Sequence, residues 1–277
     1  MPELDQLKKD NTPMQKNKFF LILVAFLILA PGLASAHQPR ITTGAETIVT
    51  DPEISKAYYA KLVGEPQVYY IHSVQPFDLY VNILVPDIVG QKKDVNLALF
   101  KKGNPDELLI VFDEGNNNWK KFFEPFGYDS YWQGAEFRTR ATAGDYLIRV
   151  WSSNNDSKYS LAIGETEAFS LRETINAISL IPEIKRNFFN EMPINFIFSP
   201  LGWGSILVMY LLAFVVGFII RLLSKKFSAR RVNKKGRLIW AIVGVVLLIL
   251  TIATSWNFIL LFLSGFCIFQ ALFLCKR

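Results

Sequence analysis

Cysteine and histidine are scarce in this sequence, and their scarcity excludes several kinds of site. The chain has two of each, and both cysteines, Cys267 and Cys275, lie in the last hydrophobic segment. Residues 37–200 can therefore form no disulfide, thiolate zinc site or cysteine nucleophile. Two histidines and no Gly-x-Ser-x-Gly motif disfavour serine-type catalysis, which needs a base beside the nucleophile. Because P-loop and dinucleotide-binding motifs are also missing, we expect a protein that is not an enzyme.

Acidic residues are missing from residues 201–277, which carry ten Lys or Arg. Residues 37–200 carry 16 Lys or Arg and 21 Asp or Glu, so the overall net charge of +6 does not describe a basic folded domain. A nucleic-acid-binding face would need such a basic domain. We therefore expect no nucleic-acid partner.

Three hydrophobic segments occupy this basic C-terminal region, at about 203–223, 238–254 and 258–274. Each is long enough, the last two barely, to cross a bilayer as a helix. Most of the basic residues lie in or beside 224–237, and basic loops stay on the cytoplasmic side. The pattern predicts a three-helix membrane anchor for residues 201–277, with the loop 224–237 and the C-terminus in the cytoplasm.

A shorter apolar run, Phe19–Ala30, lies near the N-terminus behind two lysines and ends before the small-residue triplet Ala34-Ser35-Ala36. This pattern is typical of a secretory signal peptide. We predict that residues 1–36 are such a signal, cleaved after Ala36, and that Met14 is the better start. Whether the segment is cleaved or kept as an anchor, the domain that follows would lie outside the cytoplasm.

The central part, residues 37–166, shows the two-residue alternation of half-buried strands. Turn residues separate eight candidate strands, which are Thr47–Thr50, Val68–Ser73, Phe77–Val85, Val95–Lys101, Leu108–Phe112, Glu136–Ala141, Asp145–Trp151 and Tyr159–Ile163. Short strands with no helical stretch between them predict an all-β, antiparallel sandwich or jelly roll.

The closing strands resemble a known family. Ala143–Val150 followed by Lys158–Ile163 is similar to the last hairpin of bacterial pre-peptidase C-terminal (PPC-like) domains, in which a Gly-x-Tyr strand start precedes a Tyr-x-Leu strand. Asp94–Phe100 resembles the central strand of that family. The resemblance covers about residues 68–165. It implies a jelly-roll module that acts in recognition and carries no catalytic residues.

Residues 167–200 change to helical spacing and form an amphipathic linker in our prediction. Ser170 and Glu173 have the spacing of a capping box at a helix start. Pro182 is expected to end this helix and to begin a second one. The apolar positions are Leu171, Thr174, Ile175, Ile178 and Ile181, then Ile184, Phe188 and Phe189. Such helices can lie in the membrane interface or cap the open end of the sandwich.

The two histidines suggest one metal hypothesis. Cleavage after Ala36 would make His37 the mature N-terminus, and its amine and imidazole could join the imidazole of His72 around a copper ion. Nitrogen ligands in a planar array suit Cu(II). Against this hypothesis, a lone strand histidine is usually structural.

Loop 112–136 is the second candidate site, because it is long and rich in aromatic and oxygen-bearing side chains. The aromatic side chains can stack on sugars or partners, or fold inward as a small core. The candidates for ligand or partner binding are Trp119, Phe126, Tyr128, Tyr131 and Trp132. Carboxylate and amide oxygens suit calcium, but the loop matches no calcium-loop spacing, so we do not expect calcium there.

Together these features predict a membrane-anchored, extracytoplasmic protein that recognises or scaffolds a partner. The lipid bilayer is one expected partner, and a membrane protein or an envelope ligand is another. Glycines in the hydrophobic segments offer positions where helices can approach closely. They are Gly202, Gly204, Gly217, Gly244 and Gly265. The alternatives are an extracytoplasmic copper protein and an accessory subunit of a membrane transporter or protease complex.

Overall fold

The structure is a computed structural model of the chain and describes residues 37–113, 117–223, 234–254 and 256–273. The predicted signal peptide 1–36 with Met14, most of the basic loop 224–237, and Cys275 lie outside the described residues.

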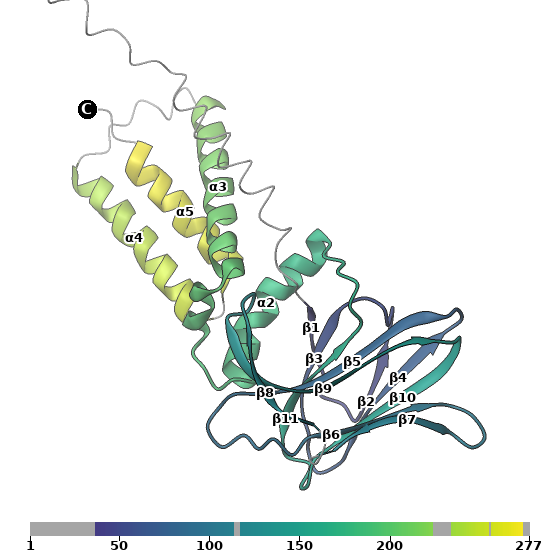
Figure 1. The fold of residues 1–277 in the computed structure, drawn as a ribbon. Coiled ribbons are helices and arrows are strands. Elements are labelled where there is room, and N and C mark those ends of the chain that lie inside the picture. The colour runs from purple at the N-terminus through teal and green to yellow at the C-terminus, as the bar shows by residue number, and fades with distance from the viewer. Residues whose placement is uncertain (1–36, 114–116, 224–233, 255, 274–277) are drawn as a thin grey trace, which may run out of the picture. The chain divides into compact units, whose positions relative to one another are not determined.

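Two β-sheets face each other in a mixed sandwich (Figure 1). Sheet A contains, in spatial order, β1 (Gln38–Ile41), β3 (Lys56–Lys61), β11 (Lys158–Ile163), β5 (Phe77–Pro86), β9 (Asp129–Ala141) and β8 (Lys120–Glu124). Sheet B contains β2 (Glu46–Val49), β4 (Gln67–Ser73), β10 (Gly144–Trp151), β6 (Asn96–Lys101) and β7 (Glu107–Phe112). All eight predicted strands are present, and β1, β3 and β8 are additional.

The strands are not all antiparallel, so that part of the prediction was wrong. β1 pairs with β3 in parallel, and β2 pairs with β4 in parallel. The reason is the path of the chain, which alternates between the two sheets from β1 to β4. Neighbouring strands in each sheet are then not consecutive in sequence. No tight hairpin joins them, and a longer connection permits the parallel direction.

The core between the sheets consists of the inward residues of both sheets, including Leu79, Ile83, Leu99 and Ile148. Burying each such side chain contributes about 1.5–3 kcal/mol. Two tyrosine hydroxyls within it are paired with each other: Tyr69 and Tyr159 lie 2.9 Å apart between their oxygens. Because the core is large and these two buried hydroxyls are paired, the sandwich can be stable without a disulfide.

The predicted loop 112–136 is mostly a β-hairpin rather than a loop, which corrects the sequence interpretation. β8 pairs with the first half of β9, with Lys120 opposite Gln133 at one end and Glu124 opposite Asp129 at the other. The sequence pattern did not indicate this hairpin, because aromatic residues occur on both of its faces and interrupt the alternation of apolar and polar residues. One face meets the core between the sheets, and the other meets the helix described next.

A single helix, α2 (Leu171–Asn187), follows the sandwich. Ser170 caps it as predicted, since its side chain accepts a hydrogen bond from the N–H of Glu173. The Glu173 carboxylate instead pairs with Arg40 of β1, at 2.9 Å. Pro182 lies inside the helix, so the predicted break was wrong. An internal proline costs about 3 kcal/mol, and burial of Ile178, Ile181 and other residues around it offsets that cost.

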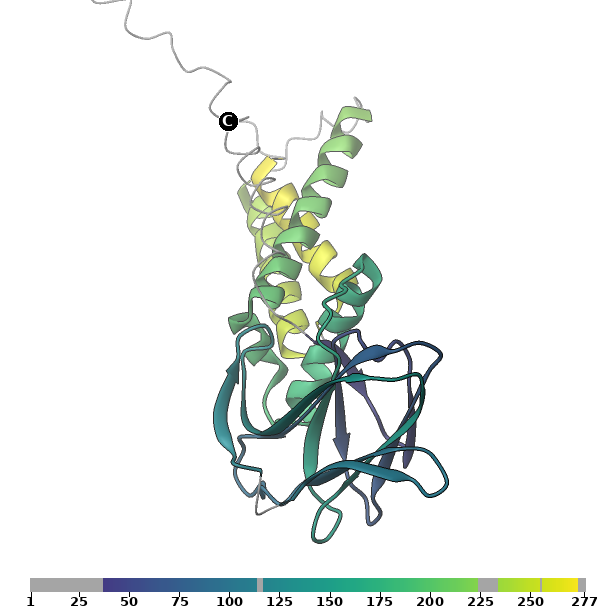
Figure 2. The same cartoon turned by 45° about the vertical axis from the view of Figure 1, so that its right-hand side comes forward.

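Helix α2 contributes to two apolar clusters, and its ribbon lies next to the strands in Figure 2. Ile184, Phe188 and Phe189 pack against sheet A, on the side chains of Tyr80, Leu84, Tyr131 and Ala162. Ala177, Ile178 and Ile181 pack in a second cluster with Phe196, Ile252, Trp256 and Leu261. The helix thus covers the outward face of sheet A rather than the open end of the sandwich, and its placement in a membrane interface stays a prediction. Leu171 and Ile175, which were predicted on the apolar face, are exposed.

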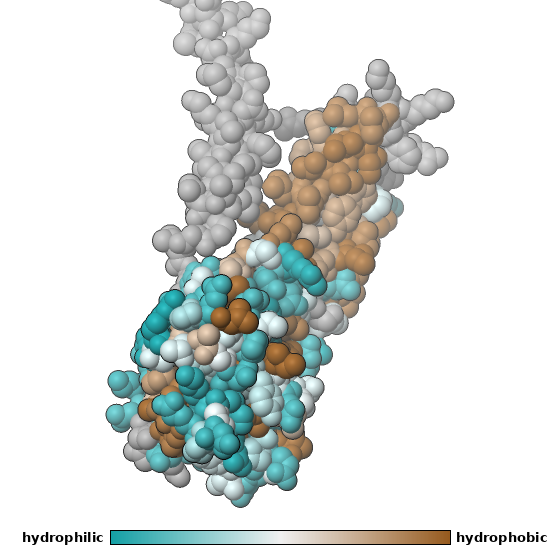
Figure 3. Space-filling model, turned by 90° about the vertical axis from the view of Figure 1, so that its right-hand side faces the viewer, coloured by the Kyte–Doolittle hydropathy of each residue, from teal (hydrophilic) through white to brown (hydrophobic). Residues whose placement is uncertain are grey.

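Three apolar helices follow the short 3-10 helix η2 (Pro193–Phe198): α3 (Pro200–Leu223), α4 (Lys234–Ala253) and α5 (Phe258–Phe273). By length and composition, α3 and α4 can cross a membrane, whereas α5 is shorter. Only 17% of the α3 window and 11% of the α4 window are buried, so neither resembles the core helix of a soluble protein. Figure 3 shows the hydrophobic side chains gathered over this helical region. The third span stays a prediction.

Ser264 of α5 joins the three helices through its hydroxyl group. The hydroxyl donates to the carbonyl of Gly244 in α4, at 2.7 Å, and lies 2.6 Å from the hydroxyl of Tyr210 in α3. A Cβ at Gly244 would lie 2.8 Å from the Ile268 side chain, and one at Gly217 would lie 2.5 Å from Phe269. A Cβ at Gly265 would likewise lie 3.0 Å from the Tyr210 side chain, so three of the predicted glycines allow close helix contacts, whereas Gly204 borders open space.

Candidate binding surface

An apolar row crosses the outward face of sheet B. Residues in register on all five strands form it, in the order Ile48, Tyr70, Leu147, Phe100 and Leu108. Their sequence neighbours Ile71, Ile148 and Leu99 are buried in the core, so the row points the other way, as strand alternation requires. Ile48 is 78% exposed, Leu108 53% and Tyr70 37%.

Sheet A has apolar residues on its outward face too, but there they are covered. Tyr80, Leu84 and Ala162 lie under α2 and are buried. The outward row of sheet B has no such cover within the described residues. A contiguous exposed apolar row is typical of a binding surface, whereas single exposed apolar residues are not informative.

A cavity of about 630 Å³ lies at one end of the row and has a largely apolar lining. Ile48 and Tyr70 line it, together with the polar side chains of Glu46, His72, Lys102 and Asp145. His72 and Asp145 face each other across β4 and β10, with Nδ1 2.5 Å from Oδ1. The surface thus offers an apolar floor beside charged groups of both signs, which suits recognition of a mixed polar and apolar partner.

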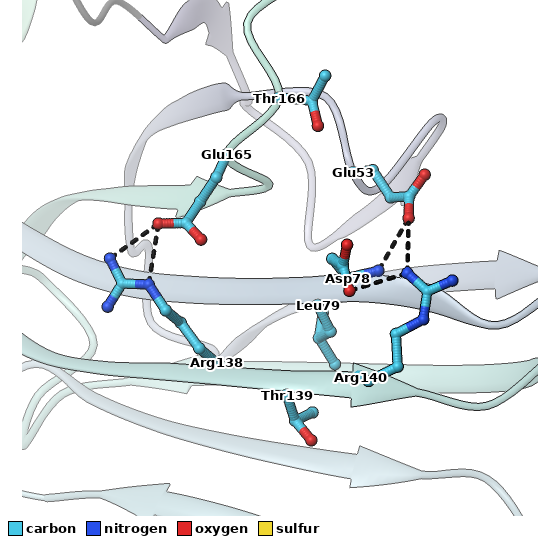
Figure 4. Close-up of a pocket in the computed structure, with 8 residues that line it drawn as sticks. All are labelled: Glu53, Asp78, Leu79, Arg138, Thr139, Arg140, Glu165 and Thr166. Atoms are coloured by element: carbon cyan, nitrogen blue, oxygen red, sulfur yellow. Dashed lines mark hydrogen bonds and ion pairs between the residues drawn. The ribbon is translucent and has the colours of Figure 1, made fainter.

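A second cavity, of about 450 Å³, is bordered by charged residues of β5, β9 and the adjoining segments (Figure 4). Arg140 lies 2.8 Å from Asp78 and 3.6 Å from Glu53, and Arg138 lies 2.8 Å from Glu165. Figure 4 shows the two arginines reaching toward these carboxylates from β9. Both guanidinium groups are occupied by internal partners, so the cavity has no arginine ready to bind an anion.

The structure does not bring the two histidines together. His37 precedes β1 in sheet A, and its Nδ1 pairs with the hydroxyl of Ser55. Burial lowers the pKa of His37, against the raising effect of Glu167 and Glu165. His72 lies on the outward face of sheet B with Asp145. Among the described residues, no three His, Cys, Asp or Glu side chains are grouped as a metal site would require.

The predicted aromatic residues are divided between several environments. Trp119 packs against the sandwich core, and its Nε1 is buried without a hydrogen-bond partner. Phe126 packs beside Phe169 near the apolar helices. Tyr128 is 48% exposed and lies against Phe198, at the tip of the β8–β9 hairpin. These three side chains do not form one surface.

Tyr131 and Trp132 follow in β9 and point to opposite faces. Tyr131 is buried under α2, where its hydroxyl lies 3.0 Å from that of Tyr59, and burial raises its pKa well above the usual value. Trp132 donates from Nε1 to Asp87 and lies under the ammonium group of Lys93. Both side chains have internal partners.

The oxygen donors of the same region also have internal partners. The buried Asn117 donates from Nδ2 to the carbonyl of Val95 and accepts from the N–H of Ala135. Asp113 likewise has a partner.

Sequence reasoning missed the sheet B row, although a signal was present. The segment Tyr146-Leu147-Ile148 is apolar at three consecutive positions. Since Tyr146 and Ile148 face the core, Leu147 must face outward. An apolar residue on the second face of a strand indicates either a cover or a binding surface, and α2 covers only sheet A.

Comparison with known proteins gives structural neighbours only. No family model matches the chain, and no curated protein matches it. One structural neighbour is the pre-peptidase C-terminal domain of a collagenase from Bacillus anthracis, with 9% identity and a TM-score of 0.26, covering 46% of this chain and 95% of that one. This neighbour is of the kind that the resemblance of residues 68–165 suggested.

Two further neighbours have equally low similarity. The surface-associated copper-binding protein CorA of Methylomicrobium album BG8 has 7% identity and a TM-score of 0.24, covering 46% of this chain and all of that one (100%). A β-glucosidase from Paenibacillus barengoltzii has 11% identity and a TM-score of 0.22, covering 46% of this chain and 13% of that one. At these scores the likenesses carry no argument about function, and the copper hypothesis gains nothing from them.

Proposed function

We propose that this chain is a membrane-anchored recognition protein whose β-domain offers the outward face of sheet B to a partner outside the cytoplasm. The row Ile48–Tyr70–Leu147–Phe100–Leu108 is the observation that carries the proposal. Ile48, Tyr70 and Leu108 are exposed, and Leu147 and Phe100 are half-buried. In this interpretation the domain binds and positions its partner and performs no reaction. The basic residues of 224–237 support a cytoplasmic position for that loop.

The connection between the β-domain and the apolar helices supports a scaffolding role. α2 packs on sheet A with one set of side chains and on residues of α4 and α5 with another. Arg186 of α2 also donates to the carbonyl of Thr254, just after α4. A flexible tether would need none of these contacts. A partner bound to sheet B would therefore be held in a fixed orientation to the helices.

Site-specific photo-crosslinking in intact membranes tests this proposal. A photoreactive phenylalanine analogue in place of Tyr70 should give discrete adducts, and the same analogue in place of Val89 should not. Val89 is 104% exposed and lies outside the row. Adding Ile48→Glu to the protein that carries the analogue at position 70 should abolish the adduct. Equal cross-linking at both positions, or none at either, would contradict the proposal. An adduct with an integral membrane protein would favour the accessory-subunit alternative.

The row variants also need a stability control. Ile48→Ser and Leu108→Ser remove exposed side chains. The free energy of unfolding should therefore change by no more than about 0.5 kcal/mol, as for other surface substitutions. A large loss of stability would mean that the row packs against another part of the chain.

A further inference from the structure

A lysine and an aspartate are shielded from water together where α2 meets the β8–β9 hairpin. The side chain of Lys185 is 0% exposed and that of Asp129 is 4% exposed, and Nζ lies 2.7 Å from Oδ1. By comparison, the partners of the Arg40–Glu173 pair are 28% and 23% exposed. A buried ion pair gains little stability over apolar packing, because desolvation of both charges opposes their attraction.

A second carboxyl group borders the same space. Glu124 is the register partner of Asp129 at the end of the β8–β9 hairpin, so both side chains are on the face that meets α2. Its two carboxylate oxygens accept hydrogen bonds from the N–H groups of Phe126, at 2.7 Å, and Gly127, at 2.6 Å. A Cβ at Gly127 would lie 2.5 Å from Asp129 Oδ2 and 3.0 Å from Glu124 Oε2. Glycine therefore leaves the two acids room to approach each other.

The electrostatics of this cluster favour a protonated Asp129. Burial raises the pKa of Asp129 to about 7, although Lys185 acts to lower it. Burial also raises the pKa of Glu124, against the lowering effect of the N–H groups of Gly127 and Phe126, and a carboxylate of higher pKa is a stronger proton acceptor. The reactive form of the pair is reached when a proton moves from Nζ to Asp129, which gives a neutral amine and a neutral acid; a water-poor site reduces the cost of this exchange, because two desolvated charges disappear. A neutral amine is a nucleophile. The carbon of a protonated carboxyl group is electrophilic, whereas the carbon of a carboxylate is not.

We propose that Lys185 and Asp129 are joined by an intramolecular amide bond between Nζ and Cγ. Since the carboxyl C–O bond is about 1.2 Å long, a nitrogen 2.7 Å from Oδ1 lies within about 4 Å of Cγ. The neutral Nζ attacks Cγ and forms the new C–N bond. Glu124 accepts a proton from the nitrogen and passes it to the departing hydroxyl group. One C–O bond breaks and one water leaves, so no oxidant or other reactant is needed.

The surroundings suit this condensation. Tyr131, Ile184 and Phe188, close in sequence to the reacting pair, are buried in one apolar cluster. Such a cluster keeps out the water that would stabilise the separated charges. The fold holds the two groups in contact, which replaces a costly encounter by a local step. The bond would join α2 to β9, whose linked residues are 56 positions apart in sequence.

Mass spectrometry of the purified full-length protein tests the bond directly. Under denaturing conditions the wild-type chain should be lighter by one water molecule than the same chain without the link. Lys185→Arg keeps the charge but blocks the reaction, so the mass of this variant should equal the mass calculated from its sequence. Proteolysis of the wild type should yield a branched peptide that joins the segments around Asp129 and Lys185, and its fragmentation should place the branch.

Two variants test the chemistry. Glu124→Gln removes the proton carrier and should leave most of the protein unlinked. Asp129→Asn offers an amide in place of the acid, so any linked product should have lost ammonia rather than water. Both variants are checked for folding by circular dichroism, and the wild-type mass decides the question even if they do not fold. A wild-type chain of full mass, or a branch at another pair such as Lys185 and Glu124, would overturn the proposal.

Discussion

Lys158 Nζ, which extends from β11, donates a 2.7 Å hydrogen bond to the carbonyl of Asn187, the last residue of α2. The same ammonium group donates to the carbonyl of Phe188 at 2.9 Å and to the side chain of Asn190 at 2.8 Å. The last carbonyls of a helix lack partners within it and carry partial negative charge. A lysine of the β-domain therefore stabilises the end of the helix that covers that domain.

Lys158→Met should loosen the end of α2 while leaving the sandwich folded. Loss of a charged hydrogen bond at a helix end costs about 1–2 kcal/mol. Hydrogen exchange of residues 184–190 should accelerate, with little change in β10. Lys61→Met is the matched control, because Lys61 is the register partner of Lys158 on the neighbouring strand β3. Equal acceleration in both variants would contradict the capping role.

The contribution of His37 to the stability of the β-domain should decrease as the pH falls below the ordinary histidine pKa of 6.5. Burial lowers the pKa of His37 below its ordinary value of 6.5, so the folded state favours the neutral ring. Its contribution is present above the unfolded pKa and is lost as the pH falls through the folded pKa. In His37→Leu, melting temperatures below pH 6.5 should vary less with pH than in the parent. If the melting temperature of His37→Leu depended on pH as strongly as that of the parent, the role of His37 would be contradicted.

Gly217→Ala should destabilise the contact between α3 and α5, since the new Cβ would lie 2.5 Å from Phe269 Cδ1. Overpacking of this kind costs typically about 1–3 kcal/mol. The matched control is Gly204→Ala in the same helix, where nothing lies within 4 Å of the added carbon. Thermal melting in mild detergent should separate the two variants. If both melt like the wild type, Gly217 does not lie against Phe269.

Labelling of single cysteines should report the sidedness of the chain. In a Cys267→Ala, Cys275→Ala background, Val89→Cys places a thiol on the β-domain and Lys235→Cys places one at the start of α4. A membrane-impermeant maleimide should label position 89 in spheroplasts and position 235 only after permeabilisation. The reverse pattern would place the β-domain in the cytoplasm and contradict both the charge argument and the proposed function.

Strands with one exposed face were predictable from the sequence, because alternation marks them. β3 is covered on both faces, since Tyr58 and Ala60 meet the core and Tyr59 packs beside Phe188 at the end of α2. β5 and β11 are covered on both faces too and were predicted, but they are rich in β-branched and other large apolar residues. β3 has two alanines and a lysine at each end, residue types that are depleted in strands. The parallel pairing of β1 with β3 was missed for another reason, since register between distant segments leaves no local signal.

The helix start at Ser170 was predictable because a cap is a local interaction. The passage of α2 through Pro182 was not, because tertiary packing overrides a local preference. The sheet B row depends on which face of each strand the rest of the chain covers. That information is absent from the strands themselves, and only the position of α2 distinguishes the open face of sheet B from the covered face of sheet A.

Helix α2 is part of two apolar clusters at once. In the membrane-anchored protein that we propose, a change in the tilt of α4 or α5 would act directly on Ile178 and Ile181 and, through α2, on Phe188 and sheet A. The β-domain would then turn with the helices, so that a change in bilayer thickness would reach the strands.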